Sequence, residues 1–257
     1  IGGWITKYAV VYVSGQASAA AADDYFTSFI TSPVSPVVFA LLFMGVTALI
    51  VYNGVQNGIE KVSRWMMPVL LVLVVVIACY SLTLSHTNAD GQVVTGWQGF
   101  LYYLTPNLEG LTVQRFLQIL LDAMSQLFFS LSVSMGIMIT YGSYVRPEVD
   151  LNRAVNQIEI FDTGVAFLAG MMIIPAGTEG MGAGPSLMFV SLPKVFAAMG
   201  RAGTAVGILF FVTAIFATLS SCISVLESIT ANCMEIFHTS RKKTVLVLSV
   251  IYLAASA

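Results

Sequence analysis

Long apolar segments recur along the chain and are separated by short polar segments. The longest runs cover 36–52, 65–84, 116–144, 160–176 and 203–236. Most of these runs approach or exceed the roughly 17 to 25 residues that a helix needs to cross a lipid bilayer. Strand-like alternation of apolar and polar positions is absent, so the pattern predicts helices rather than the strands of a barrel.

The fold class that this pattern predicts is all-α, a polytopic membrane helix bundle in a single transmembrane domain over residues 1–257. The predicted spans are 1–14, 36–52, 65–84, 113–144, 160–177, 203–237 and 242–257. The segment 178–202 is Gly-rich and then amphipathic, too interrupted to span, and is predicted to form an external re-entrant loop. Because the chain begins at Ile1 and ends at Ala257 inside apolar segments, we interpret it as a fragment.

Composition and charge place the chain in a membrane. Hydrophobic residues make up 57% and charged residues 9%, against about 25% charged in soluble proteins. Basic residues concentrate in the loops 53–64, 145–158 and 238–243, so the positive-inside rule predicts that these face the cytoplasm across the plasma (inner) membrane. The net charge of −2 offers no basic field for a nucleic acid.

The run 116–144 is too long for one untilted crossing, and polar residues occupy its centre. Ser130, Ser132 and Ser134 alternate at i, i+2 and i+4, a spacing that cannot place all three hydroxyls on one face of a regular helix. A helix broken near 132–136 would free carbonyls and hydroxyls for a cation and aim half-helix dipoles at a charged ligand. The alternative is that the serines bond back to their own helix.

Two further polar features lie in apolar segments. In "FATLSSCISVLES", residues 216–228, Ser220 and Ser224 are four apart and Ser221 lies beside them. This stripe could supply oxygen ligands to a hard cation, or hydrogen bonds between helices. Glu227 either snorkels or pairs with a base in a loop. Asp162 is costly in a membrane helix unless a cation or hydrogen bonds satisfy it, and the alternative is a cap at the helix start.

Enzyme chemistry is not expected. The two histidines, His86 and His238, fall in loops without a motif neighbour. Phosphate-binding loops and metal-binding sequences are missing. Cys79, Cys222 and Cys233 have no metal-ligand spacing and are interpreted as reduced packing residues.

An ordered set of motifs covers essentially the whole chain. It comprises "GGWITKY", "NGIEKVSRWMMP", "FLYYLTPNLEGL", "QLFFSLSVSMGIMITYGSYV", "FDTGVAFLAGMMIIPA", "GAGPSLMFVSLPKVF" and "ATLSSCISVLES". In order and spacing this set resembles the bacterial neurotransmitter:sodium symporters, the family of the bacterial leucine transporter. The resemblance implies an inverted-repeat, leucine-transporter-type fold, of which this chain would supply helices three to nine out of about a dozen.

The resemblance also implies site residues. For the first sodium site they are Ser130 and Asp162. For the second they are Ala217, Ser220 and Ser221. For the substrate pocket they are Phe129, Ser132, Met135, Ser221 and Val225.

Three positions depart from the family pattern. Ser134 stands where Gly is common at the break, and Ser220 where Thr is common. Ala166 stands where chloride-dependent members hold Ser, so no chloride site is expected, and Asp162 could supply the negative charge instead. Helices one and two of the family, which hold the other half of each site, would precede Ile1, so the chain alone is expected not to transport.

The function that follows from the resemblance is a sodium-coupled symporter that imports amino acids by alternating access. The apolar side chains of Phe129, Met135 and Val225 favour a hydrophobic or aromatic substrate. The expected partners are the amino acid, sodium ions and the lipid bilayer, with a homodimer left open and no cofactor besides Na⁺ as coupling ion. The alternatives are a proton-coupled transporter with Asp162 as the proton carrier, and a channel-like or non-transporting membrane protein.

Overall fold

The structure, a computed structural model, describes residues 1–256 except 84, 88–92, 107, 109 and 174–183. Its longer helices are α1 (Gly2–Val13), α4 (Ser35–Tyr52), α5 (Lys61–Ser81), α7 (Val113–Ser130), α9 (Leu151–Ile173), α11 (Gly200–Phe237) and α12 (Arg241–Ser256). The shorter helices are α2 (Ala17–Ala20), α3 (Tyr25–Thr31), α6 (Gly96–Leu104), α8 (Ile137–Ser143) and α10 (Leu192–Ala198). One 3₁₀ turn, η2 (Val133–Met135), and two π-helical turns, η1 (Val55–Glu60) and η4 (Leu187–Ser191), join them.

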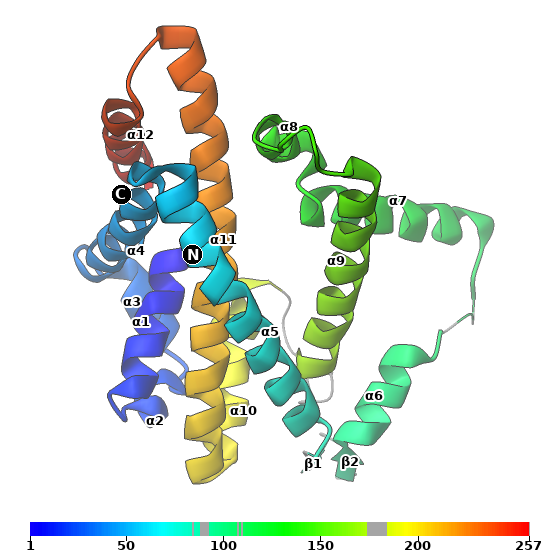
Figure 1. Cartoon of the computed structure of the whole chain (residues 1–257). Coiled ribbons are helices and arrows are strands. Elements are labelled where there is room, and N and C mark those ends of the chain that lie inside the picture. Colours follow the sequence, from blue (N-terminus) through cyan, green and yellow to red (C-terminus); the bar gives the residue numbers. More distant parts are fainter. Residues whose placement is uncertain (84, 88–92, 107, 109, 174–183, 257) are drawn as a thin grey trace.

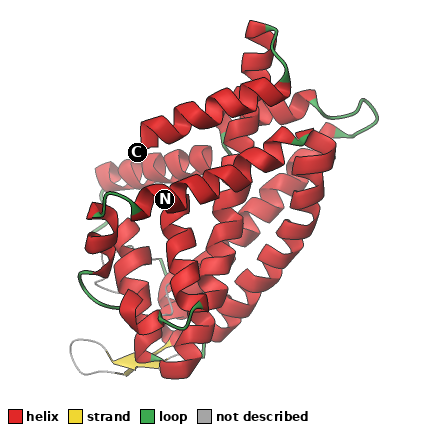
Figure 2. Cartoon of the chain, turned by 90° about the vertical axis from the view of Figure 1, so that its left-hand side faces the viewer, coloured by secondary structure: helices red, strands yellow, loops and turns green. Residues whose placement is uncertain are grey.

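The helices gather around α11, the longest of them. Helices α1, α4 and α12 lie on one side of α11, and α5 crosses it toward α9 (Figure 1). Helix α7 lies beyond α9, on the side of the molecule away from α1 and α4 (Figure 1). Seen from the side, most of the helices run roughly along one direction (Figure 2). This is the all-α architecture that the sequence predicts, with one small addition, the antiparallel hairpin of β1 (Ser85–Thr87) and β2 (Val93–Thr95).

Local sequence signals set several helix starts. Pro36 lies in the first turn of α4, where its missing N–H needs no partner. Thr95 and Gln98 form a reciprocal capping box at the start of α6. The Thr112 hydroxyl accepts a hydrogen bond from the Arg115 N–H and caps α7.

The predicted external segment 178–202 is described only from residue 184. Its described part forms η4 and α10, and Phe189, Leu192 and Phe196 are buried against α1 and α11. The Tyr8 hydroxyl of α1 donates a hydrogen bond of 2.8 Å to the Phe189 carbonyl. The described part of the segment therefore packs as a helical cap, while residues 178–183 lie outside the described part of the chain.

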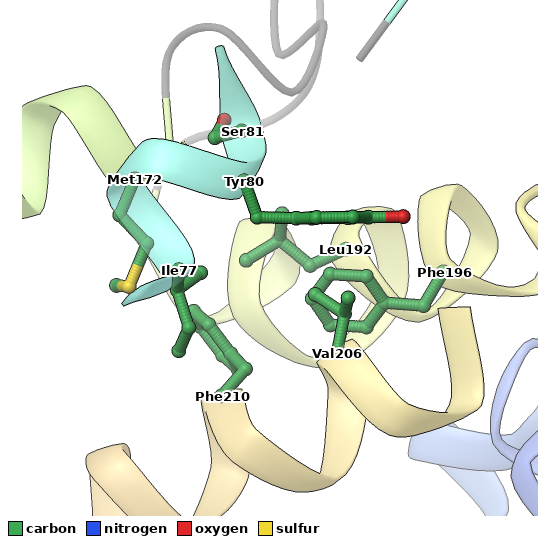
Figure 3. Close-up of a pocket in the computed structure, with 8 residues that line it drawn as sticks. All are labelled: Ile77, Tyr80, Ser81, Met172, Leu192, Phe196, Val206 and Phe210. Carbon is green, nitrogen blue, oxygen red and sulfur yellow. The ribbon is translucent and has the colours of Figure 1, made fainter. Parts of the chain in front are cut away.

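Helix α10 closes a small apolar pocket together with α5, α9 and α11 (Figure 3). Its volume of about 10 Å³ has room for at most one water molecule. It is lined by Ile77, Tyr80, Ser81, Met172, Leu192, Phe196, Val206 and Phe210.

Outside the spans, burial raises the pKa of the Tyr25 phenol in α3 above its ordinary value.

Within the described residues, three helical segments are long and apolar enough to cross a membrane. These are Ser35–Tyr52, Val55–Ser81 and Gly200–Phe237. The predicted span 113–144 is divided between α7 and α8. The helix predicted from residue 160 begins earlier, at Leu151, and its predicted end, 174–177, lies outside the described residues, as does residue 84 of the span 65–84.

Candidate ion and substrate site

The long polar-centred run is broken where the serines alternate. Helix α7 ends at Ser130, η2 follows over Val133–Met135, and α8 begins at Ile137. Ser132 and Gly136 flank η2 with left-handed backbone conformations, at φ 54° and 73°. A side chain makes this conformation costly by about 1 to 2 kcal/mol, so Ser132 is a strained position held by its surroundings. The break predicted near 132–136 is confirmed.

The end of α7 meets a carboxylate from another helix. The Ser130 hydroxyl donates a hydrogen bond of 2.6 Å to Asp162 Oδ1 of α9. This short bond is typical of an O–H donor with a charged acceptor. Ser130 is also the last residue of α7, where helix carbonyls lack intrahelical partners and the helix dipole is negative. A hydroxyl, a carboxylate and a helix C-terminus together form an environment that favours a cation.

Asp162 is not a cap at a helix start, because α9 begins at Leu151. The cap is Asp150, whose carboxylate accepts hydrogen bonds from the N–H groups of Asn152 (3.0 Å) and Arg153 (3.3 Å). Asp162 instead lies eleven residues after Leu151, in the interior of the helix. The alternative explanation of this acid as a structural cap is therefore wrong.

A second cluster of oxygens lies on α11. The hydroxyls of Ser220 and Ser221 both donate to the Ala217 carbonyl, over 2.8 and 3.2 Å. The structure thus brings together the three residues implied for the second sodium site. Both bonds lie within α11, whereas the hydrogen bond between helices that the sequence left open as the alternative for this stripe is formed by Ser224 with Tyr141. A hydroxyl that donates to a carbonyl keeps lone pairs that could serve a cation.

One side of α11 opens into a cavity of about 330 Å³ between α1, α4, α11 and α12. Ser221 and Val225, four residues apart, both line it. Its other lining residues are mostly apolar, among them Phe43 and Leu226. Two of the five residues implied for the substrate pocket therefore share one cavity.

The other three implied substrate residues lie on the broken helix and are not among those that line this cavity. Phe129 is 67% exposed, and none of the described residues of α7 is buried. Ser132 and Met135 lie at the break itself. The structure therefore presents the implied pocket in two parts, one on α11 and one at the end of α7.

Helix α8, after the break, is joined to α11 by polar contacts that the sequence did not predict. Thr140 and Ser228 share a hydrogen bond of 3.2 Å, and the hydroxyls of Tyr141 and Ser224 share one of 3.0 Å. Gly136 lies at the same contact, since a Cβ there would lie 3.4 Å from Ser228 Oγ. The signal in the sequence that could have predicted this contact is the spacing of Gly136, Thr140 and Tyr141, which places them on one helix face.

The contact ends at a buried carboxylate. Glu227 of α11 is fully buried and accepts hydrogen bonds from the Tyr144 hydroxyl (2.7 Å) and from Arg241 Nη1 and Nη2 (2.5 and 2.9 Å). Of the two roles that the sequence left open for Glu227, pairing with a loop base is the one that the structure shows. Tyr144 thereby joins the end of α8 to the ion pair.

These features define a class of protein. Helices of membrane-spanning length occur together with a helix that is broken at its polar centre, and side-chain or carbonyl oxygens gather on two other helices, at Asp162 of α9 and at Ala217, Ser220 and Ser221 of α11. Discontinuous helices of this kind supply the binding sites of secondary transporters, where freed backbone groups replace water around an ion or substrate.

The family is identified by comparison with known proteins. The model of the Sodium:neurotransmitter symporter family matches residues 34–256, and the chain belongs to this family. The family comprises transporters rather than enzymes, in agreement with the sequence. The resemblance stated from the ordered motifs is confirmed.

Relatives are similar over nearly the whole chain. An uncharacterized sodium-dependent transporter of Bacillus subtilis, YhdH, is 36% identical over 95% of this chain and 52% of its own length. One from Haemophilus influenzae is 31% identical over 98% of this chain and 55% of its own length. The chain thus spans about half the length of the curated relatives it matches.

A solved structure extends the comparison to the fold. The crystal structure of MhsT in complex with L-phenylalanine matches with a TM-score of 0.82 and 38% identity, covering 99% of this chain and 56% of that one. The leucine-transporter-type fold predicted from the motifs is therefore confirmed for this chain, and the chain is a multi-pass membrane protein.

Proposed function

We propose that this chain supplies helices of a sodium-coupled symporter that imports amino acids by alternating access. The observation that carries the proposal is the pair of oxygen clusters, Ser130 with Asp162 on one side of the break and Ala217 with Ser220 and Ser221 on α11. Hydroxyl, carbonyl and carboxylate oxygens are the ligands that hard cations prefer. Family membership and the sodium-dependent relatives support sodium as the ion.

In this proposal the first cluster is charged and the second is neutral. Asp162 would neutralise the first ion within the membrane, where an isolated charge is costly. Ala166 offers no hydroxyl for a chloride ion nearby, so the carboxylate takes the place of an anion. Sodium bound at both clusters would favour the arrangement of helices that binds substrate. The inward sodium gradient would then drive the change of the site from outward-open to inward-open.

The substrate we propose is a hydrophobic or aromatic amino acid. Phe129, Met135 and Val225 supply apolar side chains, while Ser132 and Ser221 supply hydroxyls. The similar transporter MhsT was crystallised with L-phenylalanine, which supports a substrate of this class.

We also propose that the loops 53–64, 145–158 and 238–243 face the cytoplasm. Arg241 in the third of these loops is paired with Glu227, so the ion pair would lie at the cytoplasmic end of α8 and α11. The broken helix would then cross from an external α7 to a cytoplasmic α8, with the site between them.

Uptake of labelled L-phenylalanine into proteoliposomes that contain the whole transporter tests the proposal. An inward sodium gradient should drive accumulation, and replacement of Na⁺ by choline should abolish it. Ser130→Ala should raise the sodium concentration for half-maximal uptake. Ser125→Ala is the matched control, because its hydroxyl bonds to the Leu121 carbonyl of its own helix and, among the described residues, to no other helix.

A pH gradient in choline medium separates the sodium symporter from the proton-coupled alternative. If an inward proton gradient drives uptake without Na⁺, the proposal is wrong and Asp162 carries a proton instead. Equal effects of Ser125→Ala and Ser130→Ala would remove Ser130 from the sodium site.

A further inference from the structure

Helix α12 presents two exposed apolar ridges, and each is headed by a lysine. Lys242, Leu246 and Val250 follow one another at intervals of four residues, as do Lys243, Val247 and Ile251. All six side chains are exposed, with Leu246 at 57% and Val250 at 65%. Val245 and Ser249 lie on the opposite face and are buried against the bundle. The outer face of α12 therefore combines a cationic end with an apolar length.

Helix α4 extends this face. It packs on α12, and the Tyr52 ring at its end lies under Lys242, with 5.3 Å from Nζ to the ring centroid. Leu49, almost one turn before Tyr52, is 64% exposed. The cation–π contact holds Lys242 beside an aromatic ring, and aromatic and basic side chains at the ends of membrane helices are typical of the level of the lipid headgroups.

The positive charges of the two lysines are not paired with a carboxylate within the described part of the protein. Arg241 is paired with Glu227, and Arg64 of the neighbouring helix α5 with Glu60. Among the described residues, Lys242 and Lys243 form no ion pair. They also open α12 at its N-terminal end, where the helix dipole is positive and disfavours cations. An anion at this position would compensate the unpaired charges of the lysines and their unfavourable position at the positive end of the helix dipole.

We propose that the α4–α12 face is a binding site for an anionic phospholipid. The headgroup phosphate lies between Lys242 and Lys243, and one acyl chain follows Leu246 and Val250 toward Leu49. A lipid fits better than a free anion because the exposed apolar ridges begin one turn below the lysines. The site needs only the placement of the chain in a membrane, and does not rest on the proposed transport of sodium or amino acids. In the proposed orientation it lies in the cytoplasmic leaflet.

Native mass spectrometry of the 257-residue chain in detergent, titrated with phosphatidylglycerol or phosphatidylcholine, tests the site. The expected result is a saturable phosphatidylglycerol site. The double variant Lys242→Gln/Lys243→Gln should weaken it roughly 30-fold, the loss expected for two lysines near an anionic surface. Binding of phosphatidylcholine should not change, and Lys242→Arg/Lys243→Arg should retain the affinity for phosphatidylglycerol.

The matched control is Arg146→Gln/Arg153→Gln, which removes two exposed charges from another loop on the same side. An equal loss in this control would reduce the binding to general electrostatic attraction and overturn the proposal. Displacement of the lipid by millimolar inorganic phosphate would indicate a free-anion site and also overturn it. A lipid-free dimer that buries Leu246 would assign the face to a second copy of the chain instead.

Discussion

Glu227→Gln should destabilise the protein strongly, although it changes one atom at one position. The carboxylate is fully buried and holds three charge-assisted hydrogen bonds, two from Arg241 and one from Tyr144. The amide keeps the volume and still accepts from one partner, but it leaves the Arg241 guanidinium, 22% exposed, without a counter-charge. Loss of one partner from a buried ion pair costs about 3 to 5 kcal/mol.

Thermal unfolding in detergent measures this cost. For a chain of this size, 1 kcal/mol corresponds to roughly 2 to 4 °C, so the expected decrease in Tm is roughly 6 to 20 °C. Glu60→Gln is the matched control, because its ion pair with Arg64 is exposed on both sides. Exposed pairs contribute about 0 to 1 kcal/mol, and the control should lower Tm by less than about 4 °C.

The double variant Glu227→Gln/Arg241→Gln completes the test. It removes both charges, so no cation is left uncompensated, and its destabilisation should be smaller than the sum of the two single changes. Equal Tm shifts for Glu227→Gln and Glu60→Gln would refute the reasoning. So would additive effects in the double variant, because they would mean that the two groups do not interact.

Three further changes test the break and its contacts. Gly136→Ala should destabilise the protein by about 1 to 2 kcal/mol, because φ is 73° there and the added Cβ would lie 3.4 Å from Ser228 Oγ. The control is Gly142→Ala, which has open space around it and should be neutral or stabilising in the same thermal assay. Thr140→Val should cost about 1 to 3 kcal/mol, since it leaves the buried Ser228 hydroxyl without its partner; an unchanged Tm would contradict this. Asp162→Asn should lower ²²Na⁺ affinity at least about tenfold at constant ionic strength, because a charge contact at 4 Å is worth up to about 4 kcal/mol in a protein environment; unchanged affinity would remove Asp162 from the ion site.

The break in the long helix could be predicted because its signal is local. Ser130, Ser132 and Ser134 alternate at i, i+2 and i+4, which cannot place all three hydroxyls on one face of a regular helix, and the family resemblance favoured a break over serines that bond back to their own helix. The oxygen cluster on α11 could be predicted for the same reason, since Ala217, Ser220 and Ser221 lie within about one turn of one helix. The relative positions of residues within one turn of a helix follow from the sequence alone and need no tertiary contact.

The start of α9 was missed because hydropathy indicates membrane spans and not helices. Polar and apolar residues are interspersed between Leu151 and Asp162, so the continuous apolar run begins only at residue 160. The cap at Asp150 was nevertheless present in the sequence, as an acid directly before the helix. The pairing of Glu227 with a loop base was one of the two roles left open by the sequence, but the contact of Tyr144 with Glu227 could not be found in this way, because these residues are 83 apart in sequence.

The two halves of the broken helix are bonded to different partners, and this gives the break a mechanical consequence. Helix α7 reaches α9 through Ser130 and Asp162, while α8 is bonded to α11 through Thr140, Tyr141 and Tyr144. Three polar contacts, one of them to the buried Glu227 carboxylate, make the α8–α11 junction the stiffer of the two. A displacement of α9 relative to α11 must therefore be taken up by the non-helical residues between Ser130 and Ile137.

That displacement also changes the distance between the two oxygen clusters. In the proposed function one cluster would move with α9 and the other with α11, so an ion at each site would stabilise one relative position of the two helices more than another. Under this proposal, ion binding and the position of the helices would be coupled through residues 131–136 and through α5, which packs on both α9 and α11. The strained backbone at Ser132 lies within residues 131–136, where a change to a second backbone conformation would cost the least free energy.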